Sequence, residues 1–589
     1  MNALDPHSFA RLSEVRVRHV DLELEVDFER RVVRGAATLH ATGAGRLVLD
    51  TRRLTISSVT RADGAAVTWT LGADDELLGA PLTIDLADGA AAVRVEYETS
   101  RGAPALDWLA PEQTLGGEHP FLFTQGHAIE ARSWMPIQDS PAVRVTYAAR
   151  ITVPAPLLAL MSAERTGVAP SADGQRITYS FRMEQPIPAY LFALAVGRMG
   201  HRETGPRTGV FAELPMLDRA AEEFAELERM LGAAEPLGGP YRWDRFDVVV
   251  MPPSFPYGGM ENPRLTFASP TLIAGDRSLT TVVVHELAHA WAGNLVTNAT
   301  WDDFWLNEGT TVYLELRLNE LLWGRERAEF LKAWSFRELA AAIENMGATS
   351  PDTRLAYEMR GRDPAVGVTL IPYLKGAAFF WTLEDLVGRE RLDPWLRGWF
   401  ERHAFVSVTA RELIDDVRTH LLRPTDPPID LERWVHAPGM PDTPPPTSHL
   451  LEQVDSAARA WVAGEPASAL EARGVARFTP QAWRHFLGVL LASPPEAARV
   501  RELDAAFALS KSHNAEILAP WLRLEARAHE GESAIEAFLS THGRLKYVRP
   551  LYVELCASDW GKPIAKRIYA RARPRYHALV RGNLDKLLG

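Results

Sequence analysis

Two histidines and a glutamate occur at a spacing that could bind a metal ion. The run His285-Glu-Leu-Ala-His289 places two imidazoles four residues apart, so on a helix they lie one turn apart on one face. Neutral imidazole is a common zinc ligand, and a catalytic zinc takes three protein ligands and a water. Glu286 could accept a proton from that water as general base. The pattern favours a zinc hydrolase over two structural histidines beside a surface glutamate.

A third ligand comes from Trp305-Leu-Asn-Glu308-Gly, with eighteen residues between His289 and Glu308. Glu308 would open a second helix, which would aim its carboxylate. A first-turn glutamate is also favoured by the helix dipole alone, but the spacing after the two histidines favours the ligand interpretation. Glu315, two turns further along the same face, could orient a histidine ligand or form a surface ion pair. We therefore expect one Zn²⁺ per chain.

Upstream of this motif lies the segment Tyr257-Gly-Gly-Met-Glu-Asn-Pro263. Glycines let a backbone approach a ligand closely, and the carboxylate of Glu261 could bind the α-ammonium group of a substrate. An ammonium site beside the zinc would let only the first peptide bond reach the metal, which defines an exopeptidase. On its own, the segment is more typical of a Gly-Gly turn before a strand.

The helices and strands that carry these residues can be predicted from the spacing of apolar side chains and from the residues that start or end such elements. Residues 20–26 and 92–97 alternate apolar and polar side chains, as half-buried strands do, and residues 1 to about 200 are β-rich in pattern. From about 205 the pattern changes. We expect helices at 215–231, 278–293, 307–322 and 374–387, with Ser278 and Asn307 as N-caps, and a buried strand at 246–251.

The last part of the chain is set apart by proline. Residues 437–447 contain a proline-rich run that cannot continue a helix, so we expect an extended linker there. From about 449 onwards the pattern is helical, for example at 450–462 and 497–509. A stack of helix pairs is expected, without a fixed repeat.

Composition narrows the class of protein. Hydrophobic residues make up 46% and charged residues 24% of 589 residues, a globular balance that suggests about three domains. The net charge of −12 argues against unaided binding to nucleic acid or anionic membranes. Cys556 is the only cysteine, so no intrachain disulfide can form. With neither a signal peptide nor an apolar span in the sequence, we expect a cytoplasmic protein.

Taken together, these motifs resemble the M1 family of zinc aminopeptidases, within it the leukotriene A-4 hydrolase and aminopeptidase B branch. The resemblance rests on the Gly-Gly-Met-Glu-Asn segment, the histidine motif and Asn307-Glu308-Gly309, in that order. Other matching stretches lie along nearly the whole chain, at residues 47–51, 136–141, 160–163, 371–376 and 543–550.

The resemblance implies a multidomain α+β fold. A β-rich N-terminal saddle would span residues 1–203, a thermolysin-like zinc catalytic domain 204–436, a proline-rich linker 437–448, and an α-helical, armadillo-like domain 449–589. The active site would lie in the cleft where the three domains meet. Short peptides would be the partners. The oligomeric state is left open, and a monomer is compatible with the sequence.

The resemblance also assigns roles residue by residue. His285, His289 and Glu308 match the zinc ligands, and Glu286 matches the general base. Tyr373 matches a tyrosine that donates a hydrogen bond to the tetrahedral oxyanion. The residues that match substrate-binding positions are Glu261 for the amine, Gly258, Gly259, Met260 and Gln125 around it, and Arg544 and Lys546 for the C-terminal carboxylate of short peptides.

Three positions depart from the family pattern. His127 stands where the hydrolase branch has glutamine, and we expect its neutral imidazole to contact the substrate near the amine. Ala365 replaces an aspartate tied to epoxide hydrolysis, and Val368 replaces an active-site tyrosine. Both replacements make the wall more apolar and argue for broad or apolar first residues. A lipid-epoxide hydrolase with residual peptidase activity is the alternative function, and a non-catalytic binding protein or a zinc endopeptidase are further ones.

Overall fold

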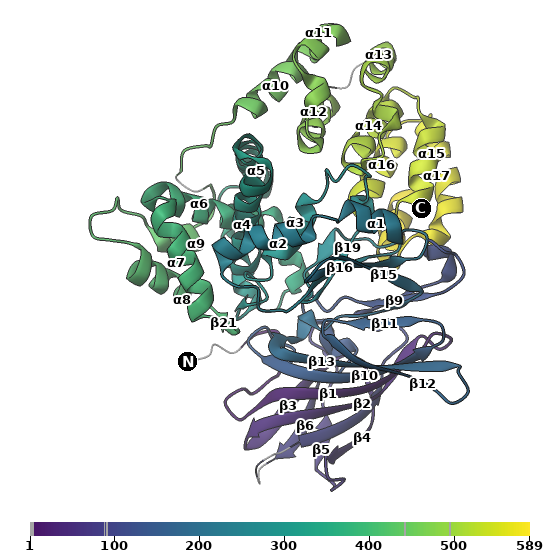
Figure 1. The fold of residues 1–589 in the computed structure, drawn as a ribbon, viewed down its shortest axis with the longest axis vertical. Helices are drawn as coiled ribbons and strands as arrows, with labels where there is room; N and C mark the ends of the chain where they lie inside the picture. The colour runs from purple at the N-terminus through teal and green to yellow at the C-terminus, as the bar shows by residue number, and fades with distance from the viewer. Residues whose placement is uncertain (1–4, 87–88, 90–91, 441–442, 494–495) are drawn as a thin grey trace.

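The computed structural model describes the chain except for residues 1–4, 87–88, 90–91, 441–442 and 494–495. Strands dominate up to about residue 270, and helices dominate after it. In Figure 1 the β-rich part lies below, the helices of the middle of the chain lie above it to the left, and the C-terminal helices run across the top and down the right. The three-domain architecture expected from the sequence is confirmed.

The N-terminal part contains a seven-stranded, a four-stranded and a three-stranded sheet. Their orders are β12-β13-β10-β1-β2-β7-β4, β11-β14-β9-β8 and β3-β6-β5. The strands are β1 (Val15–Asp27), β2 (Val32–Gly43), β3 (Gly45–Thr51), β4 (Thr55–Arg61), β5 (Trp69–Leu71), β6 (Ala80–Leu86), β7 (Ala92–Glu98), β8 (Leu106–Leu109), β9 (Phe121–Thr124), β10 (Arg144–Pro154), β11 (Leu158–Met161), β12 (Glu164–Pro170), β13 (Arg176–Pro188) and β14 (Leu194–Gly197).

The alternation predicted for residues 20–26 and 92–97 has the expected cause. In β1 the side chains of Val20, Leu22 and Leu24 are buried, and those between them point outward. β1 pairs antiparallel with β2 and parallel with β10. The seven-stranded sheet therefore has one apolar face on the core and one polar outer face.

A five-stranded sheet of order β15-β16-β17-β19-β18 begins the catalytic part. Its strands are β15 (Met199–Gly205), β16 (Thr208–Glu213), β17 (Phe246–Val250), β18 (Gly259–Met260) and β19 (Leu265–Ala268), and a small pair follows, β20 (Val296–Asn298) with β21 (Val406–Val408). The division predicted between residues 203 and 204 falls inside β15, and the predicted domain boundaries stay a prediction. β18, from the Gly-Gly segment, is the edge strand.

The catalytic helices pack around this sheet. They are α1 (Leu217–Glu223), α2 (Leu227–Gly238), α3 (Thr281–Ala288), α4 (Trp305–Trp323), α5 (Arg325–Met346), α6 (Gly376–Val387), α7 (Arg389–Arg402), α8 (Ala410–Asp416) and α9 (Leu431–His436). A 3-10 turn, η5 (Trp301–Asp303), leads into α4, and a π-helical turn, η8 (Ile371–Lys375), leads into α6.

The C-terminal part is helical, as expected. Its helices are α10 (His449–Val462), α11 (Ala467–Ala472), α12 (Pro480–Ala492), α13 (Ala497–Phe507), α14 (Ala515–Arg527), α15 (Glu532–Thr541), α16 (Leu545–Cys556), α17 (Gly561–Ala572) and α18 (Ala578–Leu588). The described part of the predicted linker has no regular structure, and its residues 441–442 lie outside the described residues.

Two apolar cores hold these parts together. One runs through the N-terminal sheets and the catalytic helices, and the other fills the C-terminal helices. Helix α5 joins them, because Phe330 and Ala333 belong to the C-terminal core whereas Leu339 and Ile343 belong to the first. Among the described residues, no helix combines the length and apolar character that crossing a membrane requires.

Two predicted helix caps were wrong. Helix α3 begins three residues after Ser278, because the amide and hydroxyl of Ser278 both donate to the carboxylate of Asp276. Asn307 lies in the first turn of α4. This helix starts earlier, at Trp305, because the 3-10 turn η5 leads directly into it. The predicted helix at 215–231 is interrupted between α1 and α2. These shifts leave the spacing of the chemical groups intact.

Candidate active site

The two motif histidines lie at the end of a short helix. His285 is in the last turn of α3, and His289 is its C-terminal cap with helical backbone angles. The geometry one turn apart is therefore kept, and the Nε2 atoms of the two rings are 3.2 Å apart. Glu308, in the first turn of α4, places Oε2 3.5 Å from Nε2 of His285 and 3.6 Å from Nε2 of His289. The three side chains converge on one point.

These separations fit a tetrahedral metal ion. Two ligands at zinc distances of about 2.0–2.1 Å stand roughly 3.3 Å apart, close to all three measured distances. Glu308 Oε2 is also buried without a hydrogen-bond partner in the described part of the chain. Because an unpaired buried carboxylate oxygen is costly, this atom is placed for a ligand that the protein itself does not supply. The donor set fits zinc.

Both histidines present the ring nitrogen that a metal needs. Nδ1 of His285 lies 3.0 Å from Oε2 of Glu315, and a carboxylate only accepts, so Nδ1 carries the proton. Nδ1 of His289 lies 3.0 Å from the carbonyl oxygen of Ala292, which likewise only accepts. The Nε2 atoms therefore offer lone pairs. The orienting contact predicted for Glu315 is present in the structure.

The Gly-Gly segment passes directly beside the base. A Cβ atom on Gly259 would stand 2.2 Å from Oε1 of Glu286, and one on Gly258 would stand 2.5 Å from a terminal nitrogen of Arg544. A larger residue at either position would push the Glu286 carboxylate or the Arg544 guanidinium away from the segment. Ligand atoms of Glu261, Glu286 and His289 all lie within 4.8 Å of one another. The segment thus brings the carboxylate of Glu261 next to Glu286, the predicted general base, and His289, a predicted metal ligand.

Tyr373 faces the same centre from η8. Its ring centroid lies 6.4 Å from that of His285 and 6.1 Å from that of Phe304. Burial raises the pKa of Tyr373 well above its ordinary value, and the carboxylates of Glu308 and Glu261 raise it further. The phenol therefore keeps its proton and acts as a hydrogen-bond donor.

The N-terminal domain contributes Gln125 and His127, which follow β9. Nε2 of Gln125 lies 3.3 Å from the sulfur of Met260, in the Gly-Gly segment. His127 is enclosed by aromatic rings, with its centroid 4.7 Å from Trp301 and 5.3 Å from Phe304. Burial lowers the pKa of His127, so its ring is neutral.

The two cations of the C-terminal domain differ. Arg544 is buried against the Gly-Gly segment, and the next residue, Leu545, donates its backbone N–H to the carbonyl of Pro256. Lys546 instead forms an ion pair with Glu516. Lys546 is therefore already partnered within the protein.

The replacements at Ala365 and Val368 lie in and beside a 3-10 turn, η7 (Pro364–Gly367). Both side chains are exposed. The turn precedes η8, which carries Tyr373, by a few residues. The apolar character expected from these replacements is therefore presented at the protein surface.

Several supporting residues were missed from the sequence. Thr311 places its hydroxyl 3.0 Å from Nδ1 of His289, and Asn294 donates from Nδ2 to the carbonyl of Glu261 at 2.7 Å. Asn294 is a polar residue within the apolar run that follows the zinc motif. That contrast is the signal that could have identified it, whereas Thr311 gave none.

Comparison with known proteins agrees with this geometry. Family models match residues 224–426 as a peptidase family M1 domain, residues 17–191 as a peptidase M1 N-terminal domain, and residues 478–588 as the C-terminal part of leukotriene A4 hydrolase. Together they span most of the chain.

Full-length relatives have similar sequences and the same fold. A leukotriene A-4 hydrolase of Xenopus laevis is 38% identical over 94% of this chain and 93% of its own length. A leucine aminopeptidase 2 of Yarrowia lipolytica is 34% identical over 99% of this chain and 93% of its own. Yeast LTA4 hydrolase matches with a TM-score of 0.92 and 30% identity, covering 99% of this chain and 97% of that one. With two histidines and a glutamate that converge, a buried carboxylate beside them and this likeness along its length, the chain belongs to the M1 family of zinc metallopeptidases.

Proposed function

We propose that this enzyme is an aminopeptidase that removes residues from the N-termini of short peptides. One observation carries the proposal: the carboxylate of Glu261 lies within 4.8 Å of the base Glu286 and the ligand His289. A substrate ammonium bound by Glu261 places the first peptide bond, and no later one, beside the base. Yeast LTA4 hydrolase has also been solved with bestatin bound, at 30% identity to this chain.

In the proposed mechanism, each group acts at a stated atom. His285, His289 and Glu308 would hold a zinc ion, which would supply a Lewis acid for polarising the scissile carbonyl and acidifying a water. Burial raises the pKa of Glu286 to about 8, and the positive charge of a bound zinc ion would lower it towards the range in which the carboxylate acts as a base. Glu286 accepts the proton of the attacking water at its carboxylate and later delivers it to the leaving amine. The phenol of Tyr373 donates to the oxyanion that develops in the transition state.

Substrate length is set at the opposite end of the peptide. The guanidinium of Arg544 lies against Gly258, one residue before β18. An extended peptide can pair with an edge strand such as β18. We propose that Arg544 then binds the C-terminal carboxylate of a short peptide, with Lys546 in a smaller role because Glu516 already neutralises it.

The first residue of the substrate is proposed to be broad or apolar in type. Neutral His127 would line the site near the amine, and the exposed Ala365 and Val368 offer no charged partner for a basic first residue. The single cysteine, which cannot form an intrachain disulfide, supports a place in the reducing cytoplasm.

The test is cleavage of a panel of aminoacyl fluorogenic amides, each free and N-acetylated, with and without a chelator. We expect cleavage of the free-amine compounds only, abolished by the chelator and restored by zinc. Equal cleavage of acetylated compounds would show an endopeptidase. Failure of the zinc-loaded enzyme on all amides, with hydrolysis of a lipid epoxide, would establish the alternative function.

A further inference from the structure

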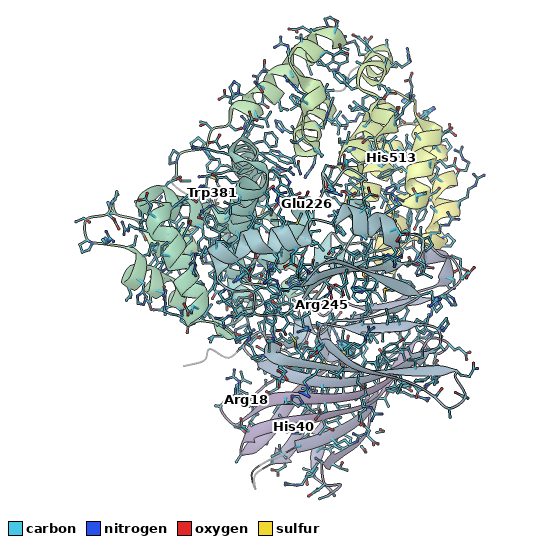
Figure 2. The ribbon with its side chains drawn as sticks, in the orientation of Figure 1. Arg18, His40, Glu226, Arg245, Trp381 and His513 are labelled. Carbon is cyan, nitrogen blue, oxygen red and sulfur yellow. The ribbon has the colours of Figure 1, made fainter. Side chains whose placement is uncertain are left out.

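A second cluster of two histidines and a carboxylate lies on the outer face of the N-terminal sheet. His19 and Asp21 belong to β1, and His40 belongs to β2. His19 and His40 are directly opposite each other in the antiparallel pair, and Asp21 is two residues along, so all three side chains point to the same face. Figure 2 shows His40 among the N-terminal strands, away from the helices of the catalytic part.

The ligand atoms of this cluster already face one another. Nε2 of His19 lies 3.3 Å from Oδ1 of Asp21, and Nε2 of His40 lies 2.7 Å from Oδ2 of the same carboxylate. All three ligand atoms lie within 4.8 Å of each other. Two zinc ligands stand roughly 3.3 Å apart, and the contact between His19 and Asp21 already has this spacing. The half-exposed ring of His40 would withdraw by about 0.6 Å to reach the same spacing.

A neighbouring strand fixes the ring of His19. Thr146 on β10 lies beside His19 in the parallel pair, with Oγ1 2.7 Å from Nδ1. The Thr146 hydroxyl can donate its proton to the carbonyl of Arg18 at 3.4 Å, which leaves its oxygen free to accept the Nδ1 proton of His19 when an ion is bound. In that metal-bound tautomer the lone pair of Nε2 of His19 is available to the ion, whereas without an ion Nε2 carries the proton that Asp21 accepts. Such outer hydrogen bonds orient histidine ligands in metal sites.

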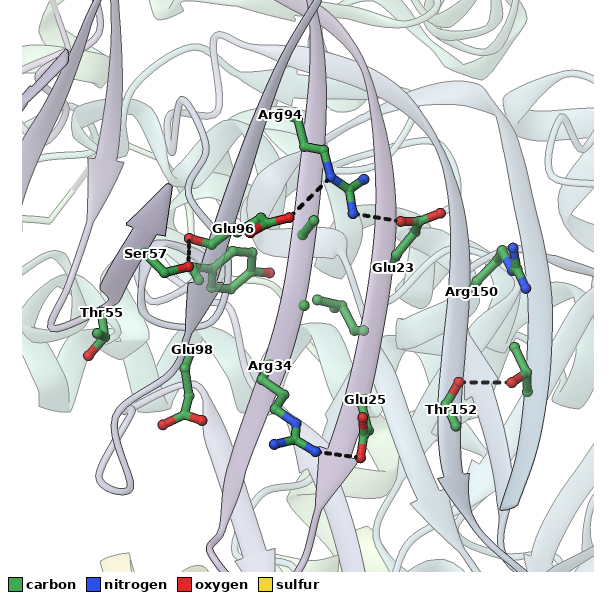
Figure 3. A pocket seen from close by; sticks show the side chains of 15 residues that line it. Glu23, Glu25, Arg34, Thr55, Ser57, Arg94, Glu96, Glu98, Arg150 and Thr152 are labelled. Carbon is green, nitrogen blue, oxygen red and sulfur yellow. Dashed lines mark hydrogen bonds and ion pairs between the residues drawn. The ribbon is translucent and has the colours of Figure 1, made fainter. Parts of the chain in front are cut away.

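Elsewhere on this face of the sheet, carboxylates of β1 pair with arginines instead of histidines. A groove of about 780 Å³ follows the same sheet (Figure 3). In it, Glu23 pairs with Arg94 at 2.9 Å and Glu25 pairs with Arg34 at 3.0 Å. Arginine therefore neutralises these carboxylates of β1, whereas Asp21, next in the same row, faces two imidazoles.

We propose that His19, Asp21 and His40 bind one divalent first-row transition ion, such as Zn²⁺, in addition to the catalytic ion. Two imidazoles and one carboxylate suit this class of ion. The side chains are between about one-third and one-half exposed, at 32%, 44% and 46%, so water completes the coordination. The site is independent of the proposed peptidase function.

The test uses the enzyme loaded with its catalytic zinc, which is then titrated with further Zn²⁺ by calorimetry. The wild type takes up a second equivalent. His40→Gln and Asp21→Asn each weaken that uptake at least tenfold, and Thr146→Val weakens it by about tenfold or more without removing a ligand. The electron paramagnetic resonance spectrum of bound Cu²⁺ shows coupling to two ring nitrogens in the wild type and to fewer in His40→Gln.

A matched control is His436→Gln. His436 is 57% exposed and lies 3.6 Å from the carboxylate of Glu432, so its surroundings resemble those of His40. It belongs to none of the groups of three possible metal ligands found among the described residues. This variant keeps the second equivalent. A wild type that takes up no second equivalent, or a His40→Gln variant that binds it as tightly, would overturn the proposal.

Discussion

Two regions of this protein each combine two histidines with one carboxylate, and they differ in their surroundings. In the catalytic cluster, Glu308 is almost fully buried and its Oε2 has no hydrogen-bond partner among the described residues. In the outer-sheet cluster, both oxygens of Asp21 accept hydrogen bonds from imidazoles, and the side chain is 44% exposed. In the catalytic cluster, Oε2 of Glu308 gains a partner only when an ion binds. In the outer-sheet cluster, the oxygens of Asp21 already have hydrogen bonds, and these must break when an ion binds.

The difference shows that the types of ligand residue alone do not determine whether a metal site is catalytic. Only the catalytic cluster stands beside a further buried carboxylate, Glu286, and a protonated phenol, Tyr373. Only there does a neighbouring segment bring a group, Glu261, that can position a substrate. Catalysis therefore depends on the groups around the ligands, and these can be removed without removing the ion.

The largest expected effect comes from the base. Glu286→Gln keeps the shape but cannot accept a proton, so kcat/KM on an aminoacyl amide falls by about 10²–10⁴. The zinc content, measured by mass spectrometry, stays at one per chain. Activity at the wild-type level would show that Glu286 is not the base, and the buried carboxylate would no longer distinguish the catalytic cluster from the outer-sheet cluster.

Next comes the donor to the oxyanion. Tyr373→Phe removes one hydrogen bond that strengthens in the transition state, so kcat falls by about 10²–10³. Because the substrate amine is bound elsewhere, KM stays near the wild-type value. An increase confined to KM, with kcat unchanged, would assign Tyr373 to substrate binding instead.

A smaller effect is expected from the group behind His285. Glu315→Gln weakens zinc affinity by about 10–100-fold, measured by competition with a chelator. Glu320→Gln is the matched control, because Glu320 lies on the same helix and pairs with Arg389. Equal affinities in the two variants would contradict the orienting role of Glu315.

The smallest effect concerns Arg544 and Lys546, of which only Lys546 forms an ion pair with Glu516. Arg544→Met should raise KM about tenfold for a tripeptide with a free C-terminal carboxylate, since one charged hydrogen bond is lost. It should leave aminoacyl amides, which lack that carboxylate, unaffected. Lys546→Met should change KM for the tripeptide less, because Glu516 holds its charge. Equal effects of both variants would remove the distinction.

The same comparison explains how far the sequence could be interpreted. His285 and His289 are four residues apart on one helix, a local relation that spacing reveals, and resemblance to a family supplied the positions of Glu261 and Tyr373. His19 and His40 meet only through the register of two strands, which no local pattern determines. The helix limits near Ser278 and Asn307 were missed because side chains and turns of the surrounding loops, such as Asp276 and η5, determine where those helices begin.

The placement of the Gly-Gly segment has a consequence for how the enzyme is made. Gln125 of the N-terminal domain contacts this segment from one side, and Arg544 of the C-terminal domain contacts it from another. During translation, the zinc ligands leave the ribosome well before Arg544 does. On the proposed assignment, a nascent or truncated chain holds its metal ligands but cannot hold a peptide by both ends. On this proposal, the contacts with both ends of a peptide are complete only after the third domain has docked, so an unfinished copy would bind a tripeptide more weakly than the finished enzyme.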